Sequence, residues 1–471
     1  MRKAFAVLPI VLAVSGCAVG PDYHRPPALP HSDGAFVSSP PAGASNAEPR
    51  DDWWRLYNDP ALDGLIRQAL AANTDLRVAE ANLTRAEAAL SEARTGLFPS
   101  TTVSAAATYG RTATANAAAA AKGTTADGSW TYLPGFAVAY QADLFGRVRR
   151  TIEAANANAE AVEAVRDAMR VTVVAGVARA YVDSCAYAEE LAVAERGVAL
   201  AKETLDLNVL QRNAGRLSDL ETARAETVLE QARATVAALQ GQRDANLFAL
   251  TALLGLSPKD APTAALTCKS APHVNDPIPV GDGAGLLRRR PDVRQAERQL
   301  AQQTASIGIA VADLYPTVSL GGAVGASSSS GGTLFSSRST TYSVGPSIAW
   351  TFPNISVARA RIAEAKAGAQ AALAAFDGTM LTALKESEQA LSTYAAELRR
   401  NAALTRARDA SRTAYALVQM RFQAGTISQL DLVSAEQTLI SAEQTLAQSD
   451  QAVADDQVAV FKALGGGWRS P

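Results

Sequence analysis

The chain has 471 residues, and its 44 Lys and Arg nearly balance 46 Asp and Glu. This balance argues against a nucleic acid partner, because such proteins carry a basic excess or a basic stripe. Hydrophobic residues reach 48 %, but many are alanine and only 6 % of the chain is aromatic, and three His and three Cys leave little for a metal site or a thiol enzyme.

The first residues predict export from the cytoplasm. The basic pair Arg2-Lys3 and an apolar run over 4–14 precede Gly16-Cys17. This is the pattern of a secretory signal peptide over 1–16, and its end resembles a bacterial lipobox, in which the thiol of Cys17 is lipidated. The alternative is an ordinary signal peptide that contains a Cys. A covalent lipid on Cys17 is the only attached group that we expect, and Ala18 after it favours the outer membrane by analogy with bacterial lipoproteins.

A proline-rich segment follows the cysteine. Residues 18–50 hold seven of the 21 prolines, with Ser, Gly and Ala between them. This composition predicts an extended tether over 17–60. Length alone would suggest roughly three domains, but the remainder of the chain is a duplication.

The two halves of the chain match each other. Residues 97–100 (Leu-Phe-Pro-Ser) correspond to 314–317 (Leu-Tyr-Pro-Thr) at an offset of 217, and Ala214-Gly215 corresponds to Ala424-Gly425 at an offset of 210. The repeat is far longer than the roughly 20–50 residues of a solenoid unit. We therefore predict a domain duplicated and fused, with the first repeat over 61–257, a linker over 258–284, the second repeat over 285–465 and a tail over 466–471.

The sequence of each repeat predicts, in this order, a helix, a β-hairpin, a very long helix, a turn and a further helix. No proline occurs over 135–257 or over 354–470. A helix over about 147–212 would measure roughly 100 Å, at about 1.5 Å per residue. A seven-residue apolar rhythm favours coiled-coil packing, and an ordinary amphipathic bundle is the alternative.

The two predicted hairpins, over about 99–141 and about 317–352, alternate large apolar residues with small or polar ones. Alternating segments of about 10 residues with aromatic girdles are typical of transmembrane β-barrels, although strands of soluble sandwiches also alternate. Candidate membrane-facing aromatics are Trp130, Tyr132, Phe136, Tyr140, Tyr342, Trp350 and Phe352. Since open sheet edges are not tolerated in lipid and single-chain barrels start at about eight strands, four strands per chain require a barrel shared with other copies.

Several motifs carry a family resemblance. They are Gly16-Cys17 followed by 20–23 (Gly-Pro-Asp-Tyr), Trp53-Trp54, 143–147 (Asp-Leu-Phe-Gly-Arg), and 289–293 (Arg-Arg-Pro-Asp-Val). Together they resemble the outer-membrane factor family of TolC-like exit ducts, most of all its lipoprotein, NodT-type branch, over essentially the whole chain. One departure is 353–356 (Pro-Asn-Ile-Ser), where the family often has a glycine-rich turn.

The resemblance implies a mixed α and β membrane protein. It implies a trimer with a 12-stranded transmembrane β-barrel, four strands per chain, continued by an α-helical barrel that extends into the periplasm. It also implies outer membrane lipid around the barrel, a periplasmic adaptor, and an inner-membrane proton-driven transporter.

The tips of the long helices are candidate contact sites. The resemblance implies that both turns meet the adaptor, through Gly215, Arg216, Leu217 and Ser218 over 214–218 and through Gly425, Thr426, Ile427 and Ser428 over 424–428. Glu221 and Asp431 lie three residues after each serine, as in a helix capping box. Alternatively, these two acids form a periplasmic gate, in which a trimer gathers their carboxylates around a narrow pore and attracts cations. The two roles do not exclude each other.

Two cysteines remain in the mature chain, Cys185 in a helical pattern and Cys268 in the linker. The periplasm would permit a disulfide, but we interpret them as two unpaired, partly buried thiols.

The predicted function is the passive exit duct of a tripartite pump that exports drugs or other small toxic compounds, with no catalytic residues. Alternatives are a trimeric membrane-anchored structural protein or adhesin, or the duct of a metal-efflux or protein-secretion system. An enzyme is disfavoured because two of the three histidines lie in the tether and the sequence shows no catalytic triad, metal cluster or phosphate loop.

Overall fold

The computed structural model describes residues 18–27, 29–30, 32, 34–38, 44–45, 47–274, 276–351 and 355–466. The predicted signal peptide, Cys17, Phe352, the turn residues 353–354 and nearly all of the predicted tail lie outside the described residues. The chain divides into two compact units. One comprises Met1–Arg25, Thr84–Ala161 and Glu297–Ala375, and the other comprises Pro26–Leu83, Val162–Ala296 and Phe376–Pro471.

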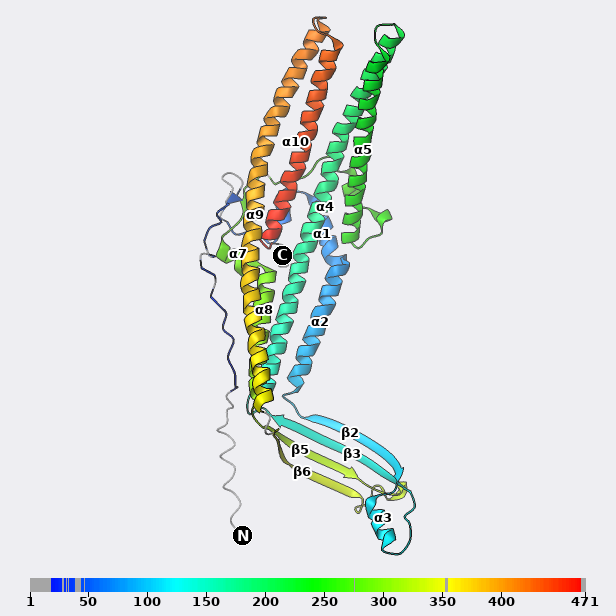
Figure 1. Cartoon of the computed structure of the whole chain (residues 1–471), viewed down its shortest axis with the longest axis vertical. Coiled ribbons are helices and arrows are strands. Elements are labelled where there is room, and N and C mark those ends of the chain that lie inside the picture. The colour runs from blue at the N-terminus through cyan, green and yellow to red at the C-terminus, as the bar shows by residue number, and fades with distance from the viewer. Residues whose placement is uncertain are drawn as a thin grey trace. The chain divides into compact units, whose positions relative to one another are not determined.

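The first unit contains a four-stranded antiparallel sheet (Figure 1). Its strands are β2 (Ser100–Gly110), β3 (Ser129–Ala142), β5 (Thr317–Ala326) and β6 (Thr340–Ala349), in the order β2-β3-β5-β6. The hairpins of the two repeats therefore join through β3 and β5, and β2 and β6 are the two edges of the sheet in this chain.

The connections at the far ends of the strands are partly ordered. The segment between β2 and β3 contains the short helix α3 (Ala113–Ala120), because its alanine run favours helix and the Thr112 hydroxyl accepts a hydrogen bond from Ala115 N–H at 3.1 Å. The second hairpin contains only the 3-10 turn η4 (Gly331–Thr333) in its connection.

The second unit contains the two helical hairpins (Figure 1). The first is formed by the end of α4 (Arg147–Asn213) and by α5 (Asp219–Leu253), and the second by the end of α9 (Ile355–Gln423) and by α10 (Gln429–Ala463). Helices α4 and α9 have 67 and 69 residues. Both repeats thus have the predicted very long helix, followed by a turn and a helix of 35 residues.

Shorter elements complete each repeat. At the end of the predicted tether lies η2 (Trp53–Tyr57), and α1 (Pro60–Ala72) then precedes α2 (Thr74–Thr95). In the second repeat, α7 (Gly283–Arg289) precedes α8 (Pro291–Ala312). The linker contains η3 (Pro258–Asp260), α6 (Thr263–Thr267) and the two-residue strand β4 (Ile278–Pro279), which pairs in parallel with β1 (Ala44–Ser45). The tether is therefore paired to the linker instead of running free over its whole length.

The core of the second unit forms around the Trp53-Trp54 motif. Trp53 is 1 % exposed and stacks on Phe461 of α10 with ring centroids 4.7 Å apart. The Trp54 indole N–H donates to Asp63 at 2.9 Å, and Asp59 caps α1 while accepting a hydrogen bond from the Tyr181 hydroxyl at 2.9 Å. Through these contacts, the Trp53-Trp54 motif and Asp59 hold η2 and α1 against the long helices.

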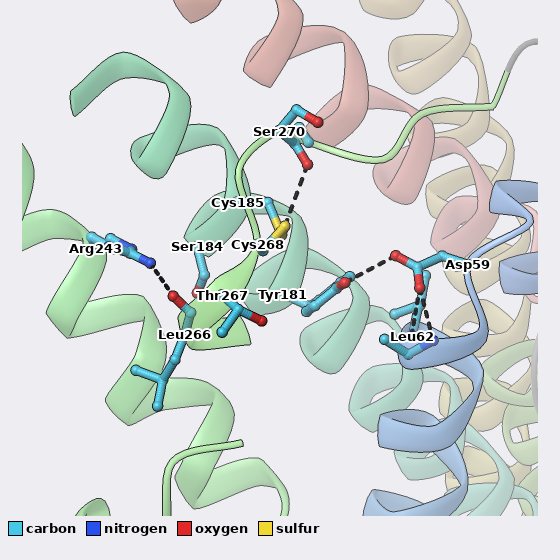
Figure 2. Close-up of a disulfide and its surroundings, with 12 residues drawn as sticks. Asp59, Leu62, Tyr181, Ser184, Cys185, Arg243, Leu266, Thr267, Cys268 and Ser270 are labelled. Atoms are coloured by element: carbon cyan, nitrogen blue, oxygen red, sulfur yellow. Dashed lines mark hydrogen bonds between the residues drawn. A yellow bond between two sulfur atoms is a disulfide. The ribbon is translucent and has the colours of Figure 1, made fainter. Parts of the chain in front are cut away.

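Cys185 of α4 and Cys268 after α6 form a disulfide, with their Cα atoms 5.1 Å apart (Figure 2). The interpretation of these residues as unpaired thiols is therefore wrong. The linker folds back onto the first repeat, where the Arg243 guanidinium also donates to the carbonyl of Leu266 at 2.7 Å. The two cysteines are 83 residues apart, and only the fold of the linker brings them together.

Each repeat closes with the same backbone turn. Helices α5 and α10 are followed by Gly255 and Gly465, both with a φ of 69°. This left-handed conformation ends a helix at little cost only for glycine. A Cβ on Gly255 would lie 2.7 Å from the carbonyl oxygen of Ala72, and a Cβ on Gly465 would lie 2.9 Å from Cγ of Arg290. The end of each hairpin is therefore packed against the start of its own repeat.

A side chain at equivalent positions of the repeats completes this contact. Asn73 precedes α2 and donates its amide to the carbonyl of Leu253, the last residue of α5, at 2.9 Å. Arg290, 217 positions later, precedes α8 and donates to the carbonyl of Ala463, the last residue of α10, at 2.9 Å. Both side chains therefore satisfy a helix-terminal carbonyl that lacks an intrahelical partner. We call Asn73 and Arg290 the latch residues.

Candidate functional site

The sheet has one face of large apolar side chains. Directly opposed residues of antiparallel strands point to the same side, and the register aligns Val103, Phe136, Val324 and Tyr342 in one row across all four strands. A second row aligns Tyr140, Leu320 and Pro346. The alternate residues along each strand point to the other side and are mostly Ser, Thr, Gly and Ala. The predicted alternation therefore produces one continuous apolar face.

This apolar face is uncovered in the single chain. Tyr342, Val344 and Ile348 are 85 %, 78 % and 71 % exposed, respectively. An exposed apolar surface of this kind marks an interaction with a membrane or a partner.

The structure places six of the seven predicted membrane-facing aromatics on the sheet or beside it. Trp130, Phe136, Tyr140 and Tyr342 are exposed, Tyr132 is half-buried, and Trp350 follows the end of β6 and is exposed. Phe352 lies outside the described residues. Trp130 contacts Tyr109, with ring centroids 5.5 Å apart, at the end of the sheet where β2 meets β3.

The tip turns of the two helical hairpins have the same geometry. Gly215 and Gly425 have φ values of 70° and 71°. In each turn the glycine N–H bonds back three residues and the next N–H bonds back five, from Arg216 to Gln211 at 2.9 Å and from Thr426 to Arg421 at 3.0 Å. This is the glycine-dependent helix end known as the Schellman motif. The remaining predicted tip residues, Leu217, Ser218, Ile427 and Ser428, lead into α5 and α10.

The acid after each turn lies in the first turn of the following helix. At the second tip the capping box is complete, because Ser428 Oγ accepts from Asp431 N–H at 3.3 Å and Asp431 accepts from Ser428 N–H at 3.0 Å. At the first tip the Ser218 hydroxyl donates to the Glu221 carboxylate, but it accepts no hydrogen bond from the first backbone N–H groups of α5. The serine hydrogen bonds lower the pKa of both carboxyls, so both are ionised at neutral pH. The capping geometry therefore holds two charged carboxylates beside the tips.

The first described residues dock onto the first unit. Val19 N–H donates to the carbonyl of Phe145 at 3.2 Å, three residues beyond the end of β3. The guanidinium of Arg150, only 5 % exposed, donates to the carbonyl of Val19 at 3.3 Å and to the Asp22 carboxylate at 2.7 Å. These contacts fix the chain two residues after Cys17 beside the end of a strand.

The same segment is held again four residues later. The Tyr23 hydroxyl donates to Glu297 of α8 at 3.1 Å, and the Arg298 guanidinium lies 5.4 Å from the Tyr23 ring centre. Burial and the neighbouring Glu297 carboxylate raise the pKa of Tyr23 to about 12, so it stays a hydrogen-bond donor. Arg25 also pairs with Glu297 at 3.6 Å. The resemblance motifs at 20–23 and 143–147 thus lie close together, and Arg290 of the motif at 289–293 is a latch residue, whereas Arg150 carried no signal in the sequence.

Other kinds of site find no support among the described residues. There, no group of three or more His, Cys, Asp and Glu side chains is arranged to hold a metal ion. In the same part of the chain, every helix is either too short or too polar to span a lipid bilayer.

The chain belongs to the outer membrane efflux protein family, whose model matches residues 65–256 and 285–466. The two matches cover one repeat each. Among curated relatives, the chain is 30 % identical to the probable efflux pump outer membrane protein TtgC of Pseudomonas putida, over 99 % of this chain and 96 % of that protein. It is 28 % identical to Nodulation protein T of Rhizobium leguminosarum bv. viciae, over 100 % of this chain and 94 % of that protein.

Solved structures agree with this assignment. The outer-membrane channel OprN is 35 % identical, with a TM-score of 0.85 over 96 % of this chain and 100 % of that chain. The MtrE outer membrane channel of Neisseria gonorrhoeae, solved in an open state, is 29 % identical, with a TM-score of 0.80 over 96 % and 99 % of the two chains. This chain is therefore an efflux channel protein of the bacterial outer membrane, of the NodT-type branch.

Proposed function

We propose that three copies of the chain form a passive exit duct through the outer membrane. The observation that carries the proposal is the sheet, which has an exposed apolar face and two edge strands, β2 and β6. Lipid tolerates no open sheet edge, so β6 of one copy pairs with β2 of the next. Three copies with four strands each then close a 12-stranded barrel around a polar lumen.

The long hairpins extend this duct into the periplasm. Their tips meet a periplasmic adaptor, which joins the duct to an inner-membrane transporter that supplies the energy. Cys17 carries the lipid anchor, and the docking of Val19 and Asp22 keeps that anchor beside the strand ends. The duct itself performs no chemistry and needs no cofactor.

Small toxic compounds, including solvents and antibiotics, are the proposed cargo. Two further relatives, both of Pseudomonas putida and both 30 % identical to this chain, are a toluene efflux pump outer membrane protein and an antibiotic efflux pump outer membrane protein. Deleting the gene should increase susceptibility to such compounds, and restoring it should reverse the effect. Unchanged susceptibility together with lost surface attachment would instead support the adhesin.

The carboxylates of Glu221 and Asp431 form a cation-attracting ring at the periplasmic end of the duct. Glu221→Ala combined with Asp431→Ala should change the conductance and lower the cation selectivity of the trimer in planar bilayers. Asp219→Ala, at an exposed acid of the same first turn, is the matched charge control. Ser218→Ala with Ser428→Ala weakens the caps but keeps both charges. Unchanged currents in the double acid variant, or equal changes in the serine variant, would remove the gate.

A further inference from the structure

A small pocket lies where the strands of the second repeat meet the long helices. Its volume is about 250 Å³, and its walls come from the α8–β5 connection, the end of β6, and the first turns of α4 and α9. The residues used below are Arg147, Asp313, Tyr315, Trp350 and Arg361. All of them belong to the first unit.

The pocket contains two cations and one anion. Asp313 accepts from Arg147 Nη1 at 2.7 Å through one carboxylate oxygen and from Arg361 Nη1 at 3.1 Å through the other. In the part of the chain that the structure describes, these are the hydrogen bonds made by the two guanidinium groups. Since arginine has five N–H donors, both forks keep donors for a further acceptor. The side chains of Arg147 and Arg361 are 47 % and 61 % exposed, so a ligand can reach them.

Aromatic rings lie beside these arginines. Trp350 follows β6 directly and is 55 % exposed, and Tyr315, two residues before β5, is 39 % exposed. Aromatic side chains at the ends of membrane strands lie at the level of the lipid head groups. A pocket with a net positive charge and flanking aromatic rings at this level fits a phosphodiester, because guanidinium forks bind phosphate oxygens in pairs.

The first repeat lacks the equivalent charges. At the equivalent positions of the other repeat, Gly96 stands in place of Asp313, Thr151 in place of Arg361, and Val357 in place of Arg147. The charged pocket is therefore not a requirement of the shared fold of the repeats, which favours a function specific to this part of the chain.

We propose that this pocket binds the phosphodiester head group of an anionic phospholipid from the inner leaflet of the outer membrane. The proposal rests on the proposed placement of the sheet in that membrane. The bound phosphate accepts hydrogen bonds from Arg147 and Arg361, and its acyl chains run along the apolar face of the sheet. One lipid would bind to each copy of the chain.

Lipid retention by the purified full-length protein tests the proposal. The protein in neutral detergent is titrated with phosphatidylglycerol or phosphatidylcholine, and bound lipid is counted by native mass spectrometry. Phosphatidylglycerol should bind the more tightly, and Arg147→Ala with Arg361→Ala should weaken it by about tenfold or more. Arg359→Ala removes an exposed charge outside the pocket from the same helix and should change nothing. Equal binding of both lipids, or equal losses in the double variant and the control, would overturn the proposal.

A second variant separates lost binding from lost folding. Asp313→Asn removes the carboxylate that competes with phosphate, so phosphatidylglycerol should bind more tightly than to the unmodified protein. Weaker or unchanged binding would overturn the proposal. Inorganic phosphate should displace the lipid only at far higher concentration, and displacement at equal concentration would show a free anion site instead. Channel conductance in bilayers is measured separately, so that a failed duct and a failed lipid site are distinguishable.

Discussion

The two repeats share backbone geometry but differ in how they hold it. Both end their second long helix with a left-handed glycine, and both satisfy its last carbonyl from the same position of the repeat. The first repeat uses the neutral amide of Asn73, whereas the second uses Arg290, which also pairs with Asp292 and Glu386 at 2.7 Å each. The fold therefore requires a hydrogen-bond donor at the latch, but it does not specify the charge of that donor.

A covalent link makes a further difference between the repeats. The disulfide ties α4 of the first repeat to the linker, whereas the position equivalent to Cys185 in the second repeat is Ala395. The two repeats thus share the turns in which the backbone adopts a left-handed conformation, but they differ in the side chains that stabilise those turns.

Removing the disulfide should have the largest effect. In a chain-entropy model, a loop of 83 residues stabilises the folded state by about 4.5 kcal/mol. Cys185→Ala with Cys268→Ala should therefore lower the melting temperature, measured by circular dichroism. Reducing agent should lower the melting temperature of the unmodified protein but leave that of the double variant unchanged. Equal sensitivity of both would show that the disulfide is not the reason.

Alanine substitution of the closing glycines should cost less and should distinguish the repeats. Gly255→Ala adds a positive-φ penalty and a clash with a backbone carbonyl, and we expect a loss of about 3 kcal/mol. Gly465→Ala adds the same positive-φ penalty but places its Cβ 2.9 Å from Cγ of Arg290 and 3.3 Å from the nearest backbone atom, so a smaller shift relieves the clash and we expect about 2 kcal/mol. Gly241→Ala, inside α5 with open space around its Cβ position, should be neutral or stabilising. Equal losses at positions 255 and 465 would contradict the asymmetry.

The latch residues provide a direct comparison between the repeats. Arg290→Ala leaves Asp292 and Glu386 without their shared cation, and because both acids are partly exposed we expect a loss of about 2–3 kcal/mol. Asn73→Ala removes a carbonyl partner and the cap of α2, and should cost about 1–2 kcal/mol. Arg288→Ala, at an exposed residue of α7, is the control for charge. The melting temperature should therefore be highest for Arg288→Ala, lower for Asn73→Ala and lowest for Arg290→Ala, and a different order would contradict the comparison.

Buried acids with raised pKa values should make the stability fall as the pH rises. Burial, and then the charges of Glu189 and Asp183, raise the pKa of Glu190 to about 7. The folded chain therefore keeps a proton that the unfolded chain loses, so this contribution is present below about pH 4.5 and is lost as the pH rises through about 7. Asp455 and Asp456, with pKa values raised by burial to about 7 and about 6, act in the same direction.

Glu190→Gln should flatten the fall of the melting temperature between pH 5 and pH 8. The equivalent position of the second repeat is Arg400, which pairs with Glu397 at 2.8 Å and contributes no buried acid. Glu195→Gln, at an exposed residue of α4, should leave the pH profile unchanged. A Glu190→Gln profile parallel to that of the unmodified protein would contradict the assignment.

Local features of the fold could be predicted from the sequence. The tip glycines, the missing prolines and the alternation of Trp130 to Tyr140 depend on a few neighbouring residues, because turns, helices and strands are specified over short distances. The duplication supplied the architecture, since one repeat predicts the elements of the other. The apolar face of the sheet also follows from the alternation, because side chains on a strand have a period of two.

Long-range contacts could not be predicted in this way. The disulfide joins residues 83 positions apart, the latch joins Arg290 to Ala463, and Asp313 gathers arginines from two helices. Composition and periodicity specify which face of an element is buried, but not which residue of another element it meets. The sequence alone thus determined the elements, their duplication and the family, whereas only the tertiary structure decided which side chains hold the repeats closed, because those pairings depend on the packing of elements far apart in the chain.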